Sequence, residues 1–206
     1  MKGLILKDLI NLKGLLKFQG ITILVFALMF ILMGNSFFLG MIILMFATMV
    51  ITTISYDEVD KWDMYALTMP VTRQEMVVSK YLVMIIVNSL GGMFALIVGF
   101  IGAVIMRQTF FTEIAAMIGF IYIITYNLGS TMIPLIYKFE TEKARLMLMF
   151  CALIPTALIF YIAQMDISLP GIDNAWVYVG LLIGLTVVGL IISINASLKI
   201  YQKKEF

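Results

Sequence analysis

The sequence contains no histidine and a single cysteine, and both shortages restrict the chemistry open to the chain. Without histidine there can be no His-containing metal site and no triad or general base built on imidazole. Cys151 lies in an apolar run and has no partner for an intrachain disulfide. No Gly-x-x-x-x-Gly-Lys-Ser/Thr segment occurs, so the chain lacks a P-loop for ATP. These absences predict a protein that is not itself an enzyme and holds no cofactor or metal.

Charge is also scarce. Charged residues make up 13% of the 206 residues, about half of the share in an ordinary soluble domain. Hydrophobic residues make up 63%, and the mean hydropathy is +1.08. A soluble protein of this composition could not cover its surface with polar groups, whereas a bilayer serves as the solvent for apolar side chains. The composition therefore predicts an integral membrane protein, and the length predicts one domain.

Six stretches lack charge and are long enough, or nearly so, to cross about 30 Å of hydrocarbon. The three residues Gly34-Asn35-Ser36 separate the first two, so we expect these two spans to form a hairpin. The predicted fold class is an all-α membrane protein with six transmembrane helices in a single domain. The predicted spans cover residues 18–33, 37–54, 81–106, 114–137, 146–163 and 175–198.

The basic residues predict the orientation of these spans. When alternate connections are assigned to opposite sides, thirteen of the fourteen Lys and Arg residues fall on one side and only Arg107 on the other. Connections on the cytoplasmic side of membrane proteins carry an excess of Lys and Arg. We therefore expect a multi-pass protein of the bacterial cytoplasmic membrane, with both termini and the two larger charged connections in the cytoplasm.

The first 17 residues form a predicted amphipathic helix. Six apolar side chains fall within about 140° of arc at helical spacing, and the four lysines lie outside that arc. Asp8 is the exception within the apolar face. We interpret the segment as an interfacial helix on the inner leaflet, with its lysines near anionic lipid headgroups. The alternative is a first span that is longer by four turns. The apolar residues are Leu4, Ile5, Leu9, Leu12, Leu15 and Leu16.

The connection over residues 55–80 has the most specific pattern, SYDEVDKWDMYALTMPVTRQEMVVSK. Four acids open it, which suits the first turns of a helix. Val59, Trp62, Ala66 and Met69 are predicted to share one stripe of that helix. Pro70 then ends it. A capping box, with the N-cap threonine at position 72 and the glutamate at position 75, is predicted to start the helix that continues into the third span.

A tryptophan on a short acidic helix has two interpretations. The helix can dock into a groove of another protein with Trp62 as its anchor. Alternatively, Trp62 lies at the level of the lipid headgroups, where tryptophan is common. The pattern does not separate these alternatives.

The 55–80 connection resembles the corresponding loop of ABC-2-type transporter permeases, in a small bacterial branch with about six spans. Within that branch the chain is similar to permeases that export phenol-soluble modulins and antimicrobial peptides. The segment 164–174 is shorter than the outer segment of larger ABC-2 permeases, which weakens any extension to polysaccharide or sterol transport. The matching residues are Tyr56, Asp57, Glu58, Asp60, Lys61, Trp62, Asp63, Tyr65, Thr68, Pro70, Val71, Thr72, Arg73, Glu75, Val77, Ser79, Lys80 and Tyr81, together with residues 1–9.

The resemblance implies that this connection is a coupling helix that touches a separate ATPase subunit. ATP and magnesium would then bind to two copies of that partner, and the permease would pair with itself or with a homologous permease. A peptide substrate and membrane lipid are the expected ligands, and nucleic acid is not. The expected coupling residues are Asp57, Glu58, Asp60, Trp62, Asp63, Tyr65, Ala66, Met69 and Arg73. A second ATPase contact is expected at Lys138, Glu140, Glu142 and Lys143.

Polar residues occur within the predicted third and fourth spans. Polar groups in hydrocarbon need partners, so these residues either bond helices to each other or line a translocation path. No acidic residue lies deep in a span, which argues against a carrier coupled to protons or sodium. The polar residues are Asn88, Ser89, Thr125, Tyr126, Asn127 and Ser130.

Small residues recur four apart in the third span, at Gly91, Ala95, Gly99 and Ala103, and Gly180 and Gly184 form a GxxxG pair in the sixth. Such faces allow close approach of helices. They predict either packing within the chain or a dimer seam.

Taken with the resemblance, these features predict the permease subunit of an ATP-driven exporter of hydrophobic or amphipathic peptides, with lipids or drugs as less favoured substrates. Two other classes stay open: a transporter or channel that acts alone, and a membrane assembly or sensor protein that transports nothing.

Overall fold

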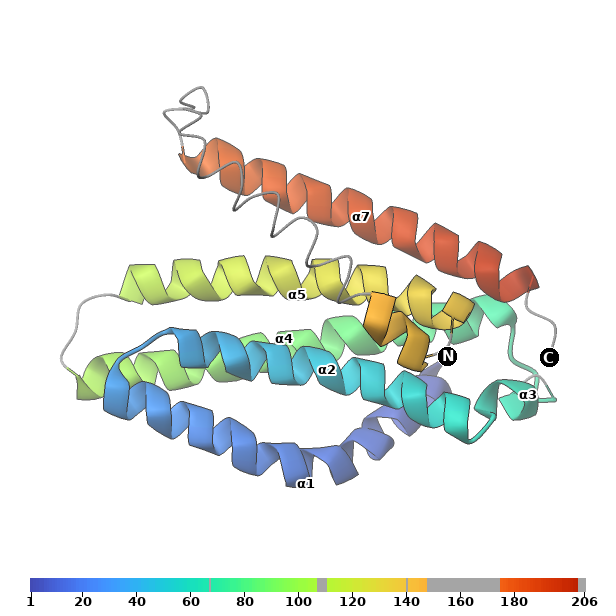
Figure 1. The fold of residues 1–206 in the computed structure, drawn as a ribbon, viewed down its shortest axis with the longest axis horizontal. Helices are drawn as coiled ribbons and strands as arrows, with labels where there is room; N and C mark the ends of the chain where they lie inside the picture. The colour runs from blue at the N-terminus through green and yellow to red at the C-terminus, as the bar shows by residue number, and fades with distance from the viewer. Residues whose placement is uncertain (67, 107–110, 140, 148–174, 204–206) are drawn as a thin grey trace.

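The computed structural model describes residues 1–66, 68–106, 111–139, 141–147 and 175–203. Every regular element in this part of the chain is a helix, which confirms the all-α prediction. Figure 1 shows the long helices lying lengthwise in one bundle. Residues 141–147 are also helical. The helices are α1 (Lys2–Met33), α2 (Phe37–Val59), α3 (Trp62–Ala66), α4 (Arg73–Ile105), α5 (Phe111–Phe139) and α7 (Ala175–Lys203).

Five of the described helices are long and apolar enough to cross a membrane, which supports a multi-pass membrane protein. The predicted span at 146–163 lies almost wholly outside the described residues. The five candidate spans cover Lys2–Met33, Phe37–Val59, Arg73–Ile105, Ile114–Phe139 and Ile183–Lys203.

One end of the bundle collects most of the described charged segments. The start of α1, all of α3, the start of α4 and the ends of α5 and α7 lie there, as Figure 1 shows. We call this the charged end. The α1–α2 turn lies at the opposite end. The start of α1 and the end of α7 therefore share one end, as predicted, and the assignment of that end to the cytoplasm stays a prediction.

The predicted hairpin between the first two spans is confirmed. Gly34 ends α1 in the left-handed region at φ +69°, where glycine has no Cβ penalty, and its N–H donates to the Phe30 carbonyl at 2.8 Å. The Asn35 side-chain oxygen accepts the Phe37 N–H at 3.0 Å and so satisfies a free donor at the start of α2.

The first 17 residues do not form a separate helix. α1 runs without a break from Lys2 to Met33, so the longer first helix is the alternative that the structure supports. Figure 1 shows that α1 bends partway along its length. The apolar stripe of its first half packs on the chain's own core rather than standing free: Leu12 is buried, and Leu4 and Leu9 pack against the core. No proline occurs within Lys2–Met33, so nothing of that kind ends the helix at residue 17, where the predicted first span begins.

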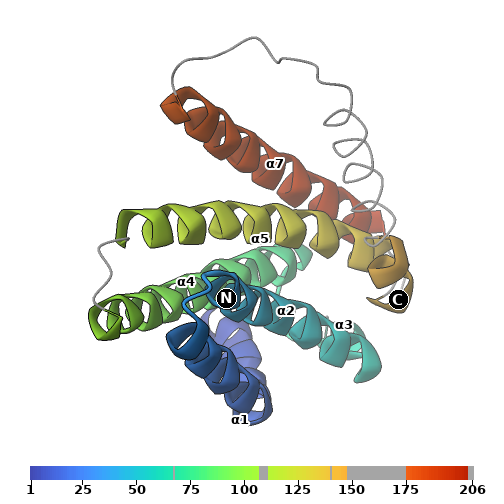
Figure 2. The same ribbon diagram turned by 60° about the vertical axis from the view of Figure 1, so that its left-hand side comes forward.

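The predicted small-residue seam on α4 is occupied by the chain itself. A Cβ added to Gly91 would lie 2.7 Å from the Cβ of Phe46, and one added to Gly99 would lie 3.0 Å from Ile114 Cγ2. Ala95 is fully buried. The face Gly91, Ala95, Gly99 and Ala103 therefore permits close packing of α4 on α2 and α5, which supports the alternative of packing within the chain. Figure 2 shows the resulting order, with α1 on one side of the α2–α4 pair and α5 and then α7 on the other.

Candidate coupling site at the charged end

The α2 helix extends further toward the charged end than the sequence predicted. It ends at Val59, and Lys61 then adopts a left-handed backbone at φ +50° before the five-residue helix α3. The Lys61 N–H donates to the Glu58 carbonyl at 3.2 Å, which closes the last turn of α2. Asp57 and Glu58 thus lie at a helix C-terminus, not in a first turn as predicted. Negative charge is unfavourable there, so these carboxylates need other partners.

The predicted apolar stripe does not exist as one face. Val59 belongs to α2 and is 78% exposed, whereas Ala66 belongs to α3 and is fully buried. The left-handed residue Lys61 changes the direction of the chain between them, so the 3.6-residue period does not carry across.

The predicted capping box is confirmed at the start of α4. The Thr72 hydroxyl oxygen accepts the Glu75 N–H at 3.2 Å, and the Thr72 N–H donates to the Glu75 carboxylate at 3.0 Å. In the first turn, the Arg73 guanidinium donates to the Gln202 carbonyl at 2.7 Å. This predicted coupling residue therefore ties the start of α4 to the end of α7.

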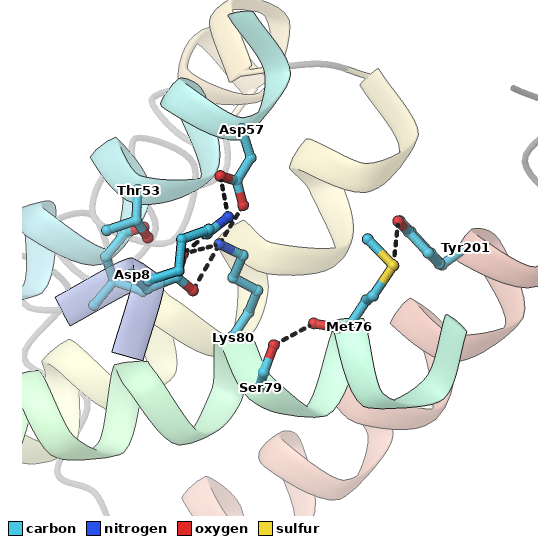
Figure 3. Close-up of polar contacts among 9 residues, drawn as sticks. Asp8, Thr53, Asp57, Met76, Ser79, Lys80 and Tyr201 are labelled. Atoms are coloured by element: carbon cyan, nitrogen blue, oxygen red, sulfur yellow. Dashed lines mark hydrogen bonds and ion pairs between the residues drawn. The ribbon is translucent and has the colours of Figure 1, made fainter. Parts of the chain in front are cut away.

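Behind α3 lies a group of four buried or half-buried charges, which we call the ion cluster: Lys7, Asp8, Asp57 and Lys80. The Lys80 ammonium lies 2.8 Å from both carboxylate oxygens of Asp8 and 2.5 Å from Asp57 Oδ2. The Lys7 ammonium lies 2.5 Å from Asp57 Oδ1 and 3.3 Å from Asp8 Oδ1. Figure 3 shows Asp8 and Asp57 converging on Lys80 from two different helices.

The ion cluster joins three candidate spans. Lys7 and Asp8 come from α1, Asp57 from the last turn of α2 and Lys80 from the third turn of α4. The Asp8 side chain is only 1% exposed, and a charge at that depth is costly unless it is paired. The two carboxylates and two ammonium groups balance in charge. The cluster is therefore a neutral clamp that holds α1, α2 and α4 together.

Sequence reasoning predicted no ion pair for these side chains: it placed Lys7 near lipid headgroups, whereas the structure pairs Lys7 with Asp57 and Asp8. Asp8 was the one signal available, since a carboxylate on an otherwise apolar helical face predicts a cationic partner on the surface it packs against. The partner itself lies 72 residues away in the sequence and becomes evident only from the packing.

Trp62 faces this cluster. The Lys7 ammonium lies 4.3 Å from the centroid of the Trp62 ring, within the range of a cation–π contact, and the ring is half-buried. Trp62, Lys7, Asp57 and Lys80 line one cavity of ≈ 220 Å³ together with Tyr201 of α7. Trp62 is thus a contact between α3 and the ion cluster.

Other side chains form the outer surface of α3 and its flanks. Val59 is 78% exposed, Met64 52%, Tyr65 58% and Met69 38%. We call these four residues the α3 surface. Asp60 beside them is also exposed. Large apolar side chains at one end of the bundle, next to acidic groups, are typical of a surface that another protein covers.

The predicted second contact lies near the first. The backbone N–H of Thr141 donates to Glu58 Oε2 at 2.9 Å, and the Thr141 hydroxyl bonds to the same oxygen. This carboxylate therefore joins the 141–147 segment to the end of α2. Lys138, Glu142 and Lys143 are exposed there, and Glu140 lies outside the described residues.

Some of the predicted polar residues of the interior bond to neighbouring helices. The Ser89 hydroxyl lies 2.9 Å from the Tyr122 hydroxyl, which lies 3.2 Å from that of Tyr126. The Asn127 amide donates to the Thr186 hydroxyl at 2.9 Å and so joins α5 to α7.

Three further interior residues differ in their contacts. The Ser130 carbonyl accepts a hydrogen bond from the Ser193 hydroxyl, and the Thr125 hydroxyl donates to the Tyr122 carbonyl of its own helix. Asn88 is buried, and neither of its side-chain polar atoms has a partner in the described part of the chain. Side-chain bonding between helices thus accounts for half of the six residues, and a path lined by these residues stays a prediction.

Comparison with known proteins gives the family of the chain. A family model described as "ABC-2 family transporter protein" matches residues 3–202. No curated protein and no solved structure matches the chain. The match includes α3, the ion cluster and every candidate span except the terminal residues Lys2 and Lys203. The chain therefore belongs to the ABC-2 family of transporter membrane proteins.

Proposed function

We propose that this permease is the membrane subunit of an ATP-driven exporter and that a separate ATPase subunit docks on the α3 surface. The observation that carries the proposal is the position of α3. It presents exposed apolar side chains on its outer side and contacts the ion cluster on its inner side.

The outer side supports docking because of its composition. Tyr65 is 58% exposed, and aromatic side chains are the commonest anchors of protein interfaces. Met64 beside it is flexible and adapts to the shape of a partner. The exposed carboxylate of Asp60 suits a basic partner surface and would act mainly on the rate of association.

The inner side revises the assignment of Trp62. Its ring contacts Lys7 rather than standing free, so we assign it to transmission and not to the anchor of the interface. A partner that pushes on Tyr65 would move Trp62, which lies 5.5 Å away ring to ring. Trp62 would shift Lys7, and the cluster would pass the displacement to α1 and α4. ATP and magnesium would bind to the partner, which supplies the energy.

Peptides that are hydrophobic or amphipathic are the substrates we propose, with lipids next. Export by a dimer needs a seam other than the α4 face. Gly180 and Gly184 on α7 are open, since an added Cβ at either meets nothing within 4 Å in the described structure. A second permease copy at α7 would place the substrate path between the protomers.

The test of the docking surface is co-purification with the ABC ATPase subunit encoded nearest to this gene. Tyr65→Ala should weaken binding about thirty-fold, because an anchoring aromatic residue contributes about 2 kcal/mol. Phe37→Ala is a matched control, since Phe37 is 54% exposed but lies at the opposite end of the bundle. Equal recovery of the ATPase with both variants would refute docking at α3.

Two rival functions predict different results. A transporter or channel that acts alone would move substrate in vesicles that hold the purified chain without an ATPase. An assembly or sensor protein would move no substrate, whether or not the ATPase is present. Peptide transport that appears only when the ATPase and ATP are both present is the result that our proposal requires.

A further inference from the structure

A second cavity lies on the side of the bundle, away from α3. Its volume is ≈ 480 Å³, within the range of small-molecule sites. We call it the α1–α2–α5 groove. Its lining residues are Gln19, Leu44, Ala47, Thr48, Ile51, Thr52, Leu128, Gly129, Met132 and Arg145.

The walls of the groove are apolar along most of its length. Leu44 and Thr52 lie eight residues apart on α2, which corresponds to about 12 Å of helix. The two threonine hydroxyls in the wall donate to α2 carbonyls, Thr48 to Met45 at 2.8 Å and Thr52 to Thr48 at 3.0 Å. They therefore offer no hydrogen-bond donor to an occupant.

Two side chains that line the groove carry polar groups open to an occupant, Arg145 and Gln19. Arg145 follows α5, is exposed, and makes no ion pair in the described part of the chain. Gln19 of α1 also lines the groove, and its side-chain oxygen is buried without a hydrogen-bond partner among the described residues. An occupant could thus offer an anionic group to Arg145 and a hydroxyl or N–H donor to Gln19.

We propose that the α1–α2–α5 groove binds one anionic phospholipid from the leaflet at the charged end. An acyl chain would lie between α2 and α5, the phosphate would pair with Arg145, and a headgroup hydroxyl would donate to Gln19. The charge of the groove favours this lipid: a guanidinium binds phosphate in a bidentate manner, and no described acid neutralises Arg145.

Phosphatidylglycerol combines the three features that the groove requires, namely an acyl chain, a phosphate and headgroup hydroxyls. A zwitterionic phosphatidylcholine has the chain and the phosphate, but its choline adds a positive charge near Arg145 and it has no hydroxyl for Gln19. The groove should therefore discriminate between these two lipids.

The experiment titrates the purified chain, in nanodiscs of phosphatidylcholine, with phosphatidylglycerol and counts the lipids that stay bound after transfer to detergent by native mass spectrometry. We expect one tightly bound phosphatidylglycerol in the native protein. Arg145→Ala should weaken it about five-fold, the fold-change that corresponds to about 1 kcal/mol for one basic residue at a membrane surface. Lys199→Ala is the control, because it removes an exposed positive charge from α7 outside the groove.

A second pair of variants tests the apolar wall. Ala47→Trp should fill the groove and abolish the bound lipid, whereas Ile97→Trp, at a 55% exposed position on α4, should leave it in place. Equal retention of phosphatidylglycerol in Arg145→Ala and Lys199→Ala would overturn the proposal, as would equal retention of phosphatidylcholine by the native protein. If Ala47→Trp changes the fraction of crosslinked dimer but not the lipid count, the groove is an interface between copies and the lipid assignment is wrong.

Discussion

Removal of one charge from the ion cluster should destabilise the protein more than removal of two. Asp8→Leu leaves the cluster with an unbalanced positive charge, and Lys80→Met leaves it with an unbalanced negative one. Breaking a buried ion pair by removing one partner costs about 3–5 kcal/mol. In Asp8→Leu/Lys80→Met the remaining Lys7–Asp57 pair, at 2.5 Å, is still neutral, and buried pairs replaced by apolar groups are often near neutral in stability. We expect the double variant to lie within about 1 kcal/mol of the native protein.

The assay is a double-mutant cycle measured by equilibrium unfolding in mild detergent. It should give a coupling energy of about 3 kcal/mol or more between Asp8 and Lys80. Lys7→Met is a graded control, because the Lys7 side chain is 21% exposed and should cost less, about 1–3 kcal/mol. Additive single effects, or single effects below about 1 kcal/mol, would show that the four charges do not act as one cluster. Transport by the double variant then separates two roles of the ion cluster. If the cluster only holds the helices together, the stable double variant should transport as the native protein does. If the cluster transmits movement through Lys80, the double variant should be stable but should not transport.

Three further outcomes follow from the fold. Gly91→Ala should lower the free energy of unfolding by about 1–3 kcal/mol, measured by thermal unfolding, because the added Cβ would lie 2.7 Å from the Cβ of Phe46. Gly119→Ala is the control and should be neutral or stabilising, since an added Cβ there meets nothing within 4 Å. Equal effects of the two changes would contradict close packing on α4. Thr72→Ala should cost about 1 kcal/mol through loss of the capping box, and an unchanged unfolding midpoint would argue against that cap. In a cysteine-free background, a cysteine at Ser36 should react with an impermeant thiol reagent from outside the cell and one at Asp60 should not; labelling of position 60 from outside would reverse the orientation.

The sequence alone determined the features that depend on neighbours along the chain. Its apolar runs predicted a membrane protein and the locations of the described spans to within a few turns. The turn at Gly34 and the capping box at Thr72 were predictable because each is set by the chemistry of a few consecutive residues. The basic residues predicted that the start of the first span and the end of the last lie at the same end of the bundle. That prediction depends only on the number of membrane crossings between them and not on how the helices pack.

The tertiary structure decided which faces meet. The period of α1 showed an apolar stripe but could not say whether lipid or protein covers it, since both are apolar solvents for the same side chains. Only packing brought Asp8 to Lys80, 72 residues apart, and thereby turned an apparent misfit into part of the ion cluster. The left-handed residue Lys61 redirected the chain and turned Trp62 inward, leaving Tyr65 exposed. A single backbone angle of this kind is invisible to a periodicity that assumes one continuous helix, so the outer surface of α3 could be assigned only from the folded chain.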